Sequence, residues 1–317
     1  MDEGKIDEAV RKHFKIIDFY MLEDGFEYIA SSENVEQAFI ALYHDILGTG
    51  ALPKLKSSGK NYSLTIFNAP KSGPSKIKPV LLVASIIALI IDGYFQVGNS
   101  ILLLVAFSLP VLVLLALHEV GRLIAGRKWG QGGLSYLVPG IPAVVPFMGF
   151  ITSPNAFPVN KNQQFDLGFF SILLALISVL PFILIGNFLP LSPISKPGIT
   201  IMSYLIGRYI NFGNPLISGA LFAFTIVFVN FLPTWQLDGG LMVDSVKYRS
   251  MGMDLLSVML MSLMGFFVFA LIIIFAQGSL GFTNPLDTVT PLSRNRRSMY
   301  YALIIIMLIG FLFLALF

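Results

Sequence analysis

Apolar runs of about 20 residues recur from roughly residue 80 to the end of the chain. A helical run of that length crosses the hydrocarbon core of a bilayer. Only 12% of the 317 residues are charged, whereas soluble domains carry about 25% charged residues. We therefore expect a polytopic α-helical membrane protein embedded in a lipid bilayer, with about six transmembrane helices. The expected spans are approximately 80–95, 101–125, 165–185, 216–232, 253–276 and 299–317.

The first 70 residues have a different character, with helical and alternating apolar patterns typical of a small soluble α+β domain. Two β-like stretches flank Glu23-Asp24-Gly25, as in a hairpin. Asn34 precedes a helical pattern and is followed three residues later by Gln37, as in a capping box. Prolines and lysines then mark a linker. The expected organisation is a soluble domain at 1–70, a linker at 71–79 and a transmembrane domain at 80–317.

Residues 130–162 are apolar but are broken by several glycines and prolines. Proline ends helices, so short β segments or re-entrant loops at the membrane surface are expected here. Two roles remain open for this region. Its strand edge is suited to pairing with an extended substrate, and its apolar surface is equally suited to capping the membrane face of the protein.

Composition excludes several chemistries. The chain has no cysteine, so disulfides, thiolate catalysis and cysteine-zinc sites are absent. Of its three histidines, His13 and His44 lie on separate predicted helices without a ligand-like neighbour, and we expect them at a surface or interface. The net charge of +3 is not gathered into a basic stripe, so no nucleic-acid partner is expected. The acidic start of the chain does not resemble a secretory signal.

Positive charges predict the orientation in the membrane. Lysines are frequent between residues 54 and 78, just before the first expected span, whereas the return at Gly98-Asn99-Ser100 has none. The N-terminal domain is therefore expected to be cytoplasmic, with His118 and Asp238 near the cytoplasmic ends of their spans. Three arginines between residues 294 and 297 fall on the opposite side by alternation. Either a span is miscounted or protein contacts hold that loop.

The second expected span carries His118-Glu119 within a run of Leu and Val. An ionised glutamate in hydrocarbon costs several kcal/mol, so packing does not explain the pair. The stretch matches His-Glu-x-x-His except that Arg122 takes the place of the second histidine. In that motif two histidines one turn apart hold a zinc ion, and the glutamate is the general base for the metal-bound water.

Asp238 follows another apolar span and precedes Gly239-Gly240. Taken alone, Asp-Gly is a common turn signal. Glycines also let the backbone turn tightly and bring a carboxylate against a neighbouring helix. Because Asp238 lies at a membrane depth that matches His118, the carboxylate becomes a candidate metal ligand.

At these positions the chain resembles the site-2 proteases, a family of intramembrane zinc metalloendopeptidases. Their second motif, Asn-x-x-Pro-x-x-x-Leu-Asp-Gly, is complete here. The resemblance covers most of the chain and is closest to the archaeal and plastid-type branch, which has an added N-terminal domain. It implies zinc bound by His118 and Asp238, and Glu119 as the catalytic base. It also implies a substrate-binding segment at Asn230 and Pro233, and membrane-protein segments or peptides as substrates.

Arg122 departs from the family at a zinc-ligand position. A guanidinium has no lone pair to donate and stays protonated, whereas catalytic zinc usually has three protein ligands. Weak or absent zinc binding is expected, with Arg122 pairing instead with Asp238 or Glu119. A second departure replaces the family's Ala-Gly-Pro with Phe169-Phe170-Ser171, so the packing near the site is expected to differ.

The sequence thus predicts a site-2-type zinc metalloprotease homologue whose hydrolysis is impaired or lost. One alternative is a residually active intramembrane zinc endopeptidase. Another is a non-proteolytic protein that binds or regulates membrane proteins. In a further alternative, which is compatible with this last hypothesis, His118-Glu119 is only a polar pair that joins two helices. A transporter is disfavoured, because the sequence has no inverted repeat or paired broken helices.

Overall fold

The computed structural model describes residues 3–69, 76–129, 135–141, 145–152, 157–189, 191, 214–247, 250–280 and 284–316. The chain divides into two compact units. The first, here called the sheet unit, comprises Met1–Pro74, Asn155–Gln164 and Thr283–Ser293. The second, the helical unit, comprises Ser75–Pro154, Phe165–Phe282 and Arg294–Phe317.

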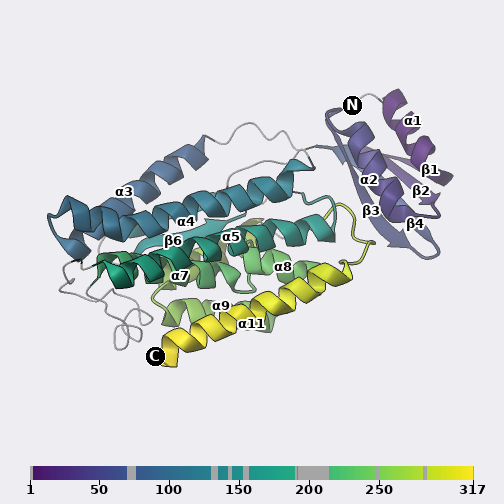
Figure 1. Ribbon diagram of the computed structural model, residues 1–317. Helices are drawn as coiled ribbons and strands as arrows, with labels where there is room; N and C mark the ends of the chain where they lie inside the picture. Colours follow the sequence, from purple (N-terminus) through teal and green to yellow (C-terminus); the bar gives the residue numbers. More distant parts are fainter. Residues whose placement is uncertain are drawn as a thin grey trace. The chain divides into compact units, whose positions relative to one another are not determined.

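The sheet unit contains two helices and a four-stranded antiparallel sheet (Figure 1). The strand order is β1-β2-β4-β3. The hairpin and the Asn34 cap are confirmed, since Leu22 pairs with Gly25 and the Asn34 side chain accepts a hydrogen bond from the Gln37 amide. The elements are α1 (Glu3–His13), β1 (Lys15–Leu22), β2 (Gly25–Ser31), α2 (Val35–Ile46), β3 (Ala51–Ser58) and β4 (Asn61–Asn68).

The core of this unit follows from its sequence periodicity. Alternate residues of β2 and β4 are buried, as are the apolar stripes of α1 and α2. His13, expected at a surface or interface, contacts Asp45 at 2.8 Å and joins α1 to α2. Hydrogen bonds from His13 and then Lys12 lower the pKa of Asp45. The packing is that of a sheet covered by helices whose apolar faces point inward.

Two distant segments continue this sheet beyond β3. The Leu55 amide donates to the Leu286 carbonyl at 2.8 Å, and the Thr288 amide donates to the Leu55 carbonyl at 3.2 Å. The Leu286 amide in turn donates to the Pro158 carbonyl at 2.8 Å. The sheet unit therefore includes segments that a boundary at residue 70 assigns to the transmembrane domain. Of the expected linker, residues 71–75 lie outside the described residues, and Ile77–Pro79 already belong to a helix.

The helical unit is built mainly of apolar helices. It also contains a short two-stranded antiparallel sheet, within residues 130–162, where the sequence predicted β segments. The strands are β5 (Tyr136–Ile141) and β6 (Val145–Ile151). The helices are α3 (Ile77–Val97), α4 (Ile101–Arg127), α5 (Lys161–Phe188), α7 (Pro215–Phe231), α8 (Asp238–Val246), α9 (Met251–Leu263), α10 (Phe267–Leu280) and α11 (Arg294–Leu316).

Three of these helices, α3, α4 and α5, are long and apolar enough to cross a membrane, with 21, 27 and 28 residues. This supports association with a membrane. The expected span at 253–276 is not one helix. It is divided between α9 and α10, because Gly265 adopts φ +87 after α9 ends, a left-handed conformation that favours glycine. The sequence also has a short apolar stretch at 199–210, which is not counted among the six expected spans and lies outside the described residues.

One of the arginines that the charge rule placed on the wrong side is held by a protein contact. The Arg296 guanidinium donates two hydrogen bonds of 2.7 Å to the two carboxylate oxygens of Asp166 in α5. Bidentate pairing of this kind is strong and fixes geometry. The pair joins the start of α11 to α5. The charge near residue 296 is therefore locally neutralised.

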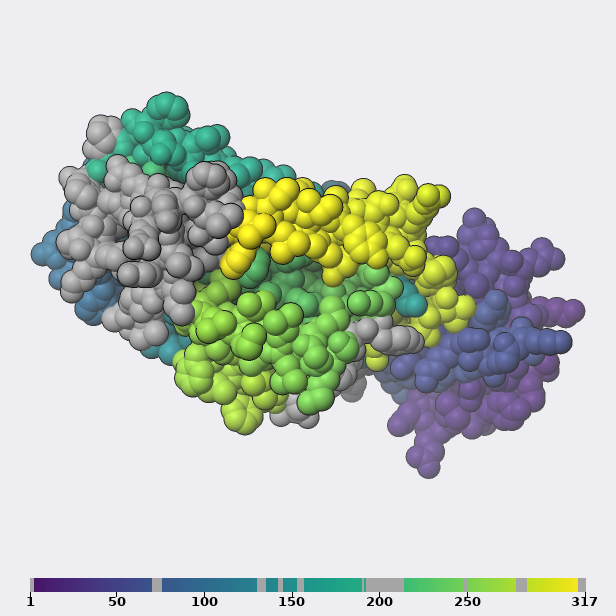
Figure 2. Space-filling view, turned by 90° about the horizontal axis from the view of Figure 1, so that it is seen from below, coloured from purple at the N-terminus to yellow at the C-terminus, as the bar shows by residue number. Residues whose placement is uncertain are grey.

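Helix α7 lies at the centre of the helical unit and is buried on nearly all faces. Gly219 permits its close approach to α4, because a Cβ there would overlap the Phe107 carbonyl oxygen. On another side, Phe228 stacks on Phe311 of α11 with ring centroids 4.9 Å apart. Figure 2 shows α11 in yellow lying against the green segments of this unit. An apolar helix without a polar face is expected to be buried in this way.

The contact at Gly219 predicts the effect of adding one methyl group. Gly219→Ala forces α4 and α7 apart, and overpacking of this kind costs about 1–3 kcal/mol. We expect a melting temperature several degrees lower for the detergent-solubilised protein. Gly252→Ala is the matched control, because the nearest atom to its added Cβ is Ser250 Oγ at 3.9 Å. Equal melting temperatures for the two variants would contradict this packing.

Candidate functional site

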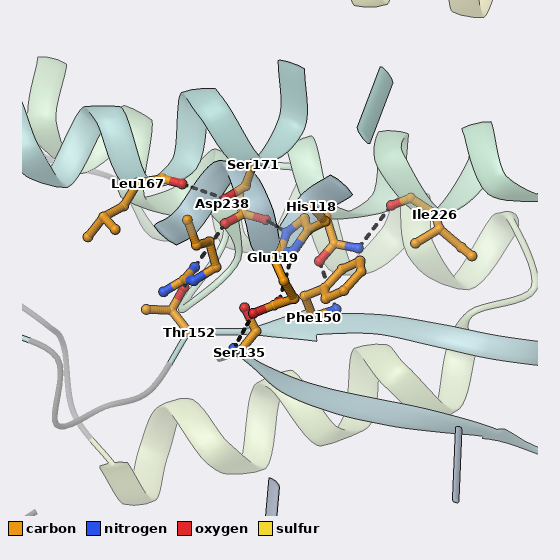
Figure 3. Close-up of polar contacts among 11 residues, drawn as sticks. His118, Glu119, Ser135, Phe150, Thr152, Leu167, Ser171, Ile226 and Asp238 are labelled. Atoms are coloured by element: carbon orange, nitrogen blue, oxygen red, sulfur yellow. Dashed lines mark hydrogen bonds and ion pairs between the residues drawn. The ribbon is translucent and has the colours of Figure 1, made fainter. Parts of the chain in front are cut away.

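Four ionisable side chains meet between two helices of the helical unit (Figure 3). Helix α4 contributes His118, Glu119 and Arg122. Arg122 follows the other two by four and three residues, the spacings at which side chains are neighbours on a helix. Asp238 is the first residue of α8. The structure thus brings together all the residues proposed as metal ligands or base, together with the arginine that departs from the motif.

Asp238 uses both carboxylate oxygens to join the two helices. Its Oδ2 lies 2.8 Å from His118 Nε2, and its Oδ1 accepts a hydrogen bond from Arg122 Nη1 at 3.3 Å. Arg122 Nη1 also donates to Thr152 Oγ1, just beyond β6, at 2.9 Å. His118, Asp238 and Arg122 are at most 5% exposed. Of the two pairings that the sequence left open for Arg122, the structure has the one with Asp238.

Glu119 makes different contacts. Its Oε1 lies 3.1 Å from His118 Nδ1, and its Oε2 accepts a hydrogen bond from the Ser135 amide at 2.9 Å. The imidazole of His118 therefore lies between two carboxylates. When both of its nitrogens carry a proton, the charges of His118, Arg122, Glu119 and Asp238 sum to zero. Such a cluster avoids the cost of burying an uncompensated charge.

Phe150 of β6 covers the imidazole. Its ring stacks on His118 with centroids 3.6 Å apart and an interplanar angle of 11°. Its amide donates to Asn230 Oδ1 at 3.0 Å, and Asn230 Nδ2 donates to the Ile226 carbonyl at 2.9 Å. Asn230 therefore joins α7 to β6. The ion cluster itself is formed by other residues.

The loop between α7 and α8 delivers Asp238 to this cluster. Gln236 has φ +53, an unusual value for a residue other than glycine. Its carbonyl accepts a hydrogen bond from the Thr152 amide at 2.8 Å, and Thr234 Oγ1 donates to Asp254 at 2.9 Å. Pro233 is half-buried in this loop. These contacts hold the strained turn that places Asp238 at the start of α8, where the helix dipole favours a carboxylate.

Glycines allow the surrounding backbones to approach. A Cβ at Gly239 would overlap the Phe231 carbonyl oxygen, and one at Gly168 of α5 would overlap that of Asp238. On α4, a Cβ at Gly121 would overlap the carbonyl oxygen of Phe170. The bulky Phe169-Phe170 pair therefore does not keep α5 away from α4, because contact is made through the backbone of Phe170.

The residues present do not fit a zinc ion. Within the described part of the chain, no group of three or more His, Asp or Glu side chains is arranged to hold a metal. His118 and Asp238 are two candidate donors, and their facing atoms contact each other. At the third position the chain has a fixed cation, Arg122, which binds Asp238 and would repel a metal ion.

Three contributors to the site were not found from the sequence. Ser135, Phe150 and Thr152 come from the segment between α4 and α5, and none belongs to a motif that names it. The one sequence signal for these residues was that their segment directly follows the helix that carries His118-Glu119. The side-chain contacts depend on the register of β5 and β6, which the sequence did not provide.

Comparisons with protein-family models, with curated proteins and with solved structures gave no match to this chain.

The cluster predicts that Asp238→Asn destabilises the protein without involving a metal. The substitution leaves the Arg122 guanidinium buried without its carboxylate, and breaking a buried ion pair from one side costs about 3–5 kcal/mol. We expect a fall of roughly 10 °C in melting temperature, the shift such a loss produces in a domain of this size. Differential scanning fluorimetry in detergent measures it.

A double-mutant cycle provides the control. Arg122→Gln combined with Asp238→Asn removes both charges, so we expect the double variant to lose less stability than the two single variants added together. The melting temperature of the unmodified protein should be the same in EDTA and in added zinc. Full stability of Asp238→Asn, or a marked rise in melting temperature with zinc, would contradict the ion-pair description.

Proposed function

We propose that this chain is a site-2-protease-like membrane protein that binds segments of other membrane proteins without zinc-dependent hydrolysis. The observation that carries the proposal is the Arg122–Asp238 contact, which places a permanent cation at the third ligand position. The arrangement of His118, Glu119 and Asp238 at one site is what the family resemblance implies. The fourth ionisable residue of the site, Arg122, is what separates this chain from an active site-2 protease.

The contacts of the candidate base also support the proposed loss of hydrolysis. In a zinc peptidase the glutamate receives a proton from a metal-bound water. Here both Glu119 oxygens are already engaged, one with His118 and the other with the Ser135 amide. The side chain of Glu119 is only 12% exposed. These contacts support a role for Glu119 in joining α4 to the residue that precedes β5.

The strands β5 and β6 are the proposed place where a bound segment lies. Phe150 of β6 stacks directly on His118, so an extended chain beside this sheet would pass close to the ion cluster. Along β5, all residues but Leu137 are only half-buried. Main-chain pairing at such an edge recognises an extended segment with little dependence on its sequence. This favours substrate pairing over a simple membrane cap.

We further propose a multi-pass topology with the N-terminal part of the sheet unit on the cytoplasmic side. Helices α3, α4 and α5 are the proposed full spans, and α7, α9, α10 and α11 complete the bundle. The lysines at positions 54, 56, 60, 76 and 78, before or at the start of α3, support this orientation. The Arg296–Asp166 pair is a protein contact of the kind that can hold this loop against the charge rule.

Zinc content tests the first part of the proposal. We expect the purified chain to retain far less than one zinc per molecule, because two donors beside a cation hold the ion weakly. Arg122→His restores a third donor, and we expect it to retain about one. Arg122→His with Asp238→Asn is the matched control and should lose it again. Stoichiometric zinc in the unmodified chain, measured by atomic emission, would favour the residually active endopeptidase instead.

A tagged reporter tests binding and cleavage together. The probe is a single-span, leucine-rich membrane segment with a central Asn-Pro break and a different tag at each end. We expect the unmodified chain to co-purify with the intact reporter, and a Leu-only reporter without the break to bind less. A cut reporter would refute the loss of hydrolysis. Failure of the intact reporter to co-purify would refute the binding role.

A further inference from the structure

The expected span at 253–276 is folded back on itself in the structure. Near the end of α10, Gln277 Nε2 donates a hydrogen bond of 3.4 Å to Oδ2 of Asp254, which lies in the first turn of α9. A straight helix would hold two residues 23 positions apart at a distance of roughly 35 Å. The start of α9 and the end of α10 therefore lie side by side, and the two helices form a hairpin.

The turn of this hairpin satisfies its own backbone groups. The Phe266 amide donates to the Met261 carbonyl at 2.8 Å. The Gly265 amide donates to the Ser262 carbonyl at 3.1 Å, and Gly265 adopts φ +87. These are the two hydrogen bonds and the left-handed glycine of a Schellman motif, which ends a helix. Met264 and Phe266 are at most 6% exposed, and non-helical backbone at membrane depth is tolerated where protein buries it.

Contacts with α7 show how far the hairpin extends. At its open end, Thr234 Oγ1, just beyond α7, donates to Asp254 Oδ1 at 2.9 Å. At its turn, Phe266 stacks on Phe222, midway along α7, with ring centroids 6.5 Å apart. The hairpin therefore starts and ends level with the loop that leads to Asp238, and it reaches only to the middle of α7.

We infer that α9 and α10 form a re-entrant hairpin, which enters and leaves the membrane on the side of the ion cluster without crossing it. This inference rests on the proposed membrane topology and refines it. The two helices have 13 and 14 residues, so each is about 20 Å long, whereas the hydrocarbon core is about 30 Å thick. Leu255, Met259 and Phe275 of the hairpin are exposed apolar side chains, as contact with lipid requires.

Other contacts place the start of α11 on the same side of the membrane as the starts of α3 and α5. The segments that lead into these three helices all belong to the sheet unit. There Leu55 is hydrogen-bonded to Leu286, and Leu286 to Pro158, so the segments lie on one side of a bilayer. Within the helical unit, the Arg296–Asp166 pair likewise joins the start of α11 to α5 near its start.

The number of crossings between the starts of α5 and α11 is therefore even. Helix α5 leaves this side and α7 returns to it, because Asn214, just before α7, donates to the Gly186 carbonyl near the end of α5 at 2.8 Å. The hairpin adds no crossing, so α11 crosses last and ends on the side opposite the N-terminal part of the chain. The arginines at 294–297 then share a side with the lysines at 54–78, as the charge rule requires.

Single-cysteine labelling of the full chain in intact cells tests this topology, and the natural chain has no cysteine to interfere. The reagent is a maleimide that does not cross membranes. Glu23→Cys, in the first turn of the sheet unit, and Asn99→Cys, in the turn between α3 and α4, are the matched references for the two sides. Asn284→Cys and a cysteine appended after Phe317 report the two ends of α11. Leu263→Cys reports the turn of the hairpin.

We expect Asn284→Cys to behave like Glu23→Cys and to be labelled only after the cells are opened. The appended cysteine should behave like Asn99→Cys and be labelled from outside. The Leu263 side chain is 53% exposed on the helical unit. Because we place it at the middle of the membrane, Leu263→Cys should be labelled only after denaturation.

Two results would overturn the inference. If Asn284→Cys matches Asn99→Cys and the appended cysteine matches Glu23→Cys, residues 253–276 form a single span. If Leu263→Cys is labelled together with Asn99→Cys, α9 and α10 are two full crossings. Labelling of both references from one side would refute the proposed topology and the inference with it. Labelling of Glu23→Cys from outside would refute only the cytoplasmic orientation, since the other positions are compared with the references.

Discussion

The buried contact between Arg122 and Asp238 determines how the helical unit is held together at its site. It joins α4 to the first residue of α8. Both groups are almost fully buried, so neither charge is tolerable without the other. His118 and Glu119 extend the contact into a neutral cluster when His118 is protonated. The strained loop before Asp238, the close approach of α5 at Gly168 and the stacking of Phe150 all surround this cluster.

An arginine and a zinc ion meet the same need differently. Arg122 places positive charge beside Asp238 and joins α4 to α8, as a metal ion held by residues of two helices would. The metal also accepts lone pairs and leaves a coordination position for water, whereas a guanidinium only donates hydrogen bonds. The charge of Arg122 is covalently attached and does not depend on metal supply. A guanidinium at this position can therefore hold the two helices together without supplying the chemistry of a metal ion.

Local signals in the sequence were sufficient for part of the fold. The hairpin around Glu23-Asp24 and the Asn34 cap depend on neighbouring residues, and both were predicted. The break at Gly265 was missed, because a single glycine in an apolar run is compatible with a continuous helix. The joining of Leu55, Leu286 and Pro158 into one sheet was also missed, since it links segments far apart in the chain without a local pattern.

The candidate site was likewise predicted only in part from the sequence. The matching membrane depths of His118 and Asp238, together with the family resemblance, predicted that Asp238 would meet His118 and Glu119. The chemistry of a guanidinium predicted that Arg122 would pair with a carboxylate. The chemistry of a guanidinium did not predict which carboxylate Arg122 would bind, because both Asp238 and Glu119 were possible partners. The difference lies in the residues next to β5 and β6. The Ser135 amide takes one oxygen of Glu119, and Thr152 takes a second hydrogen bond from Arg122 on the side of Asp238. The segment without a motif thus decides how the motif residues pair.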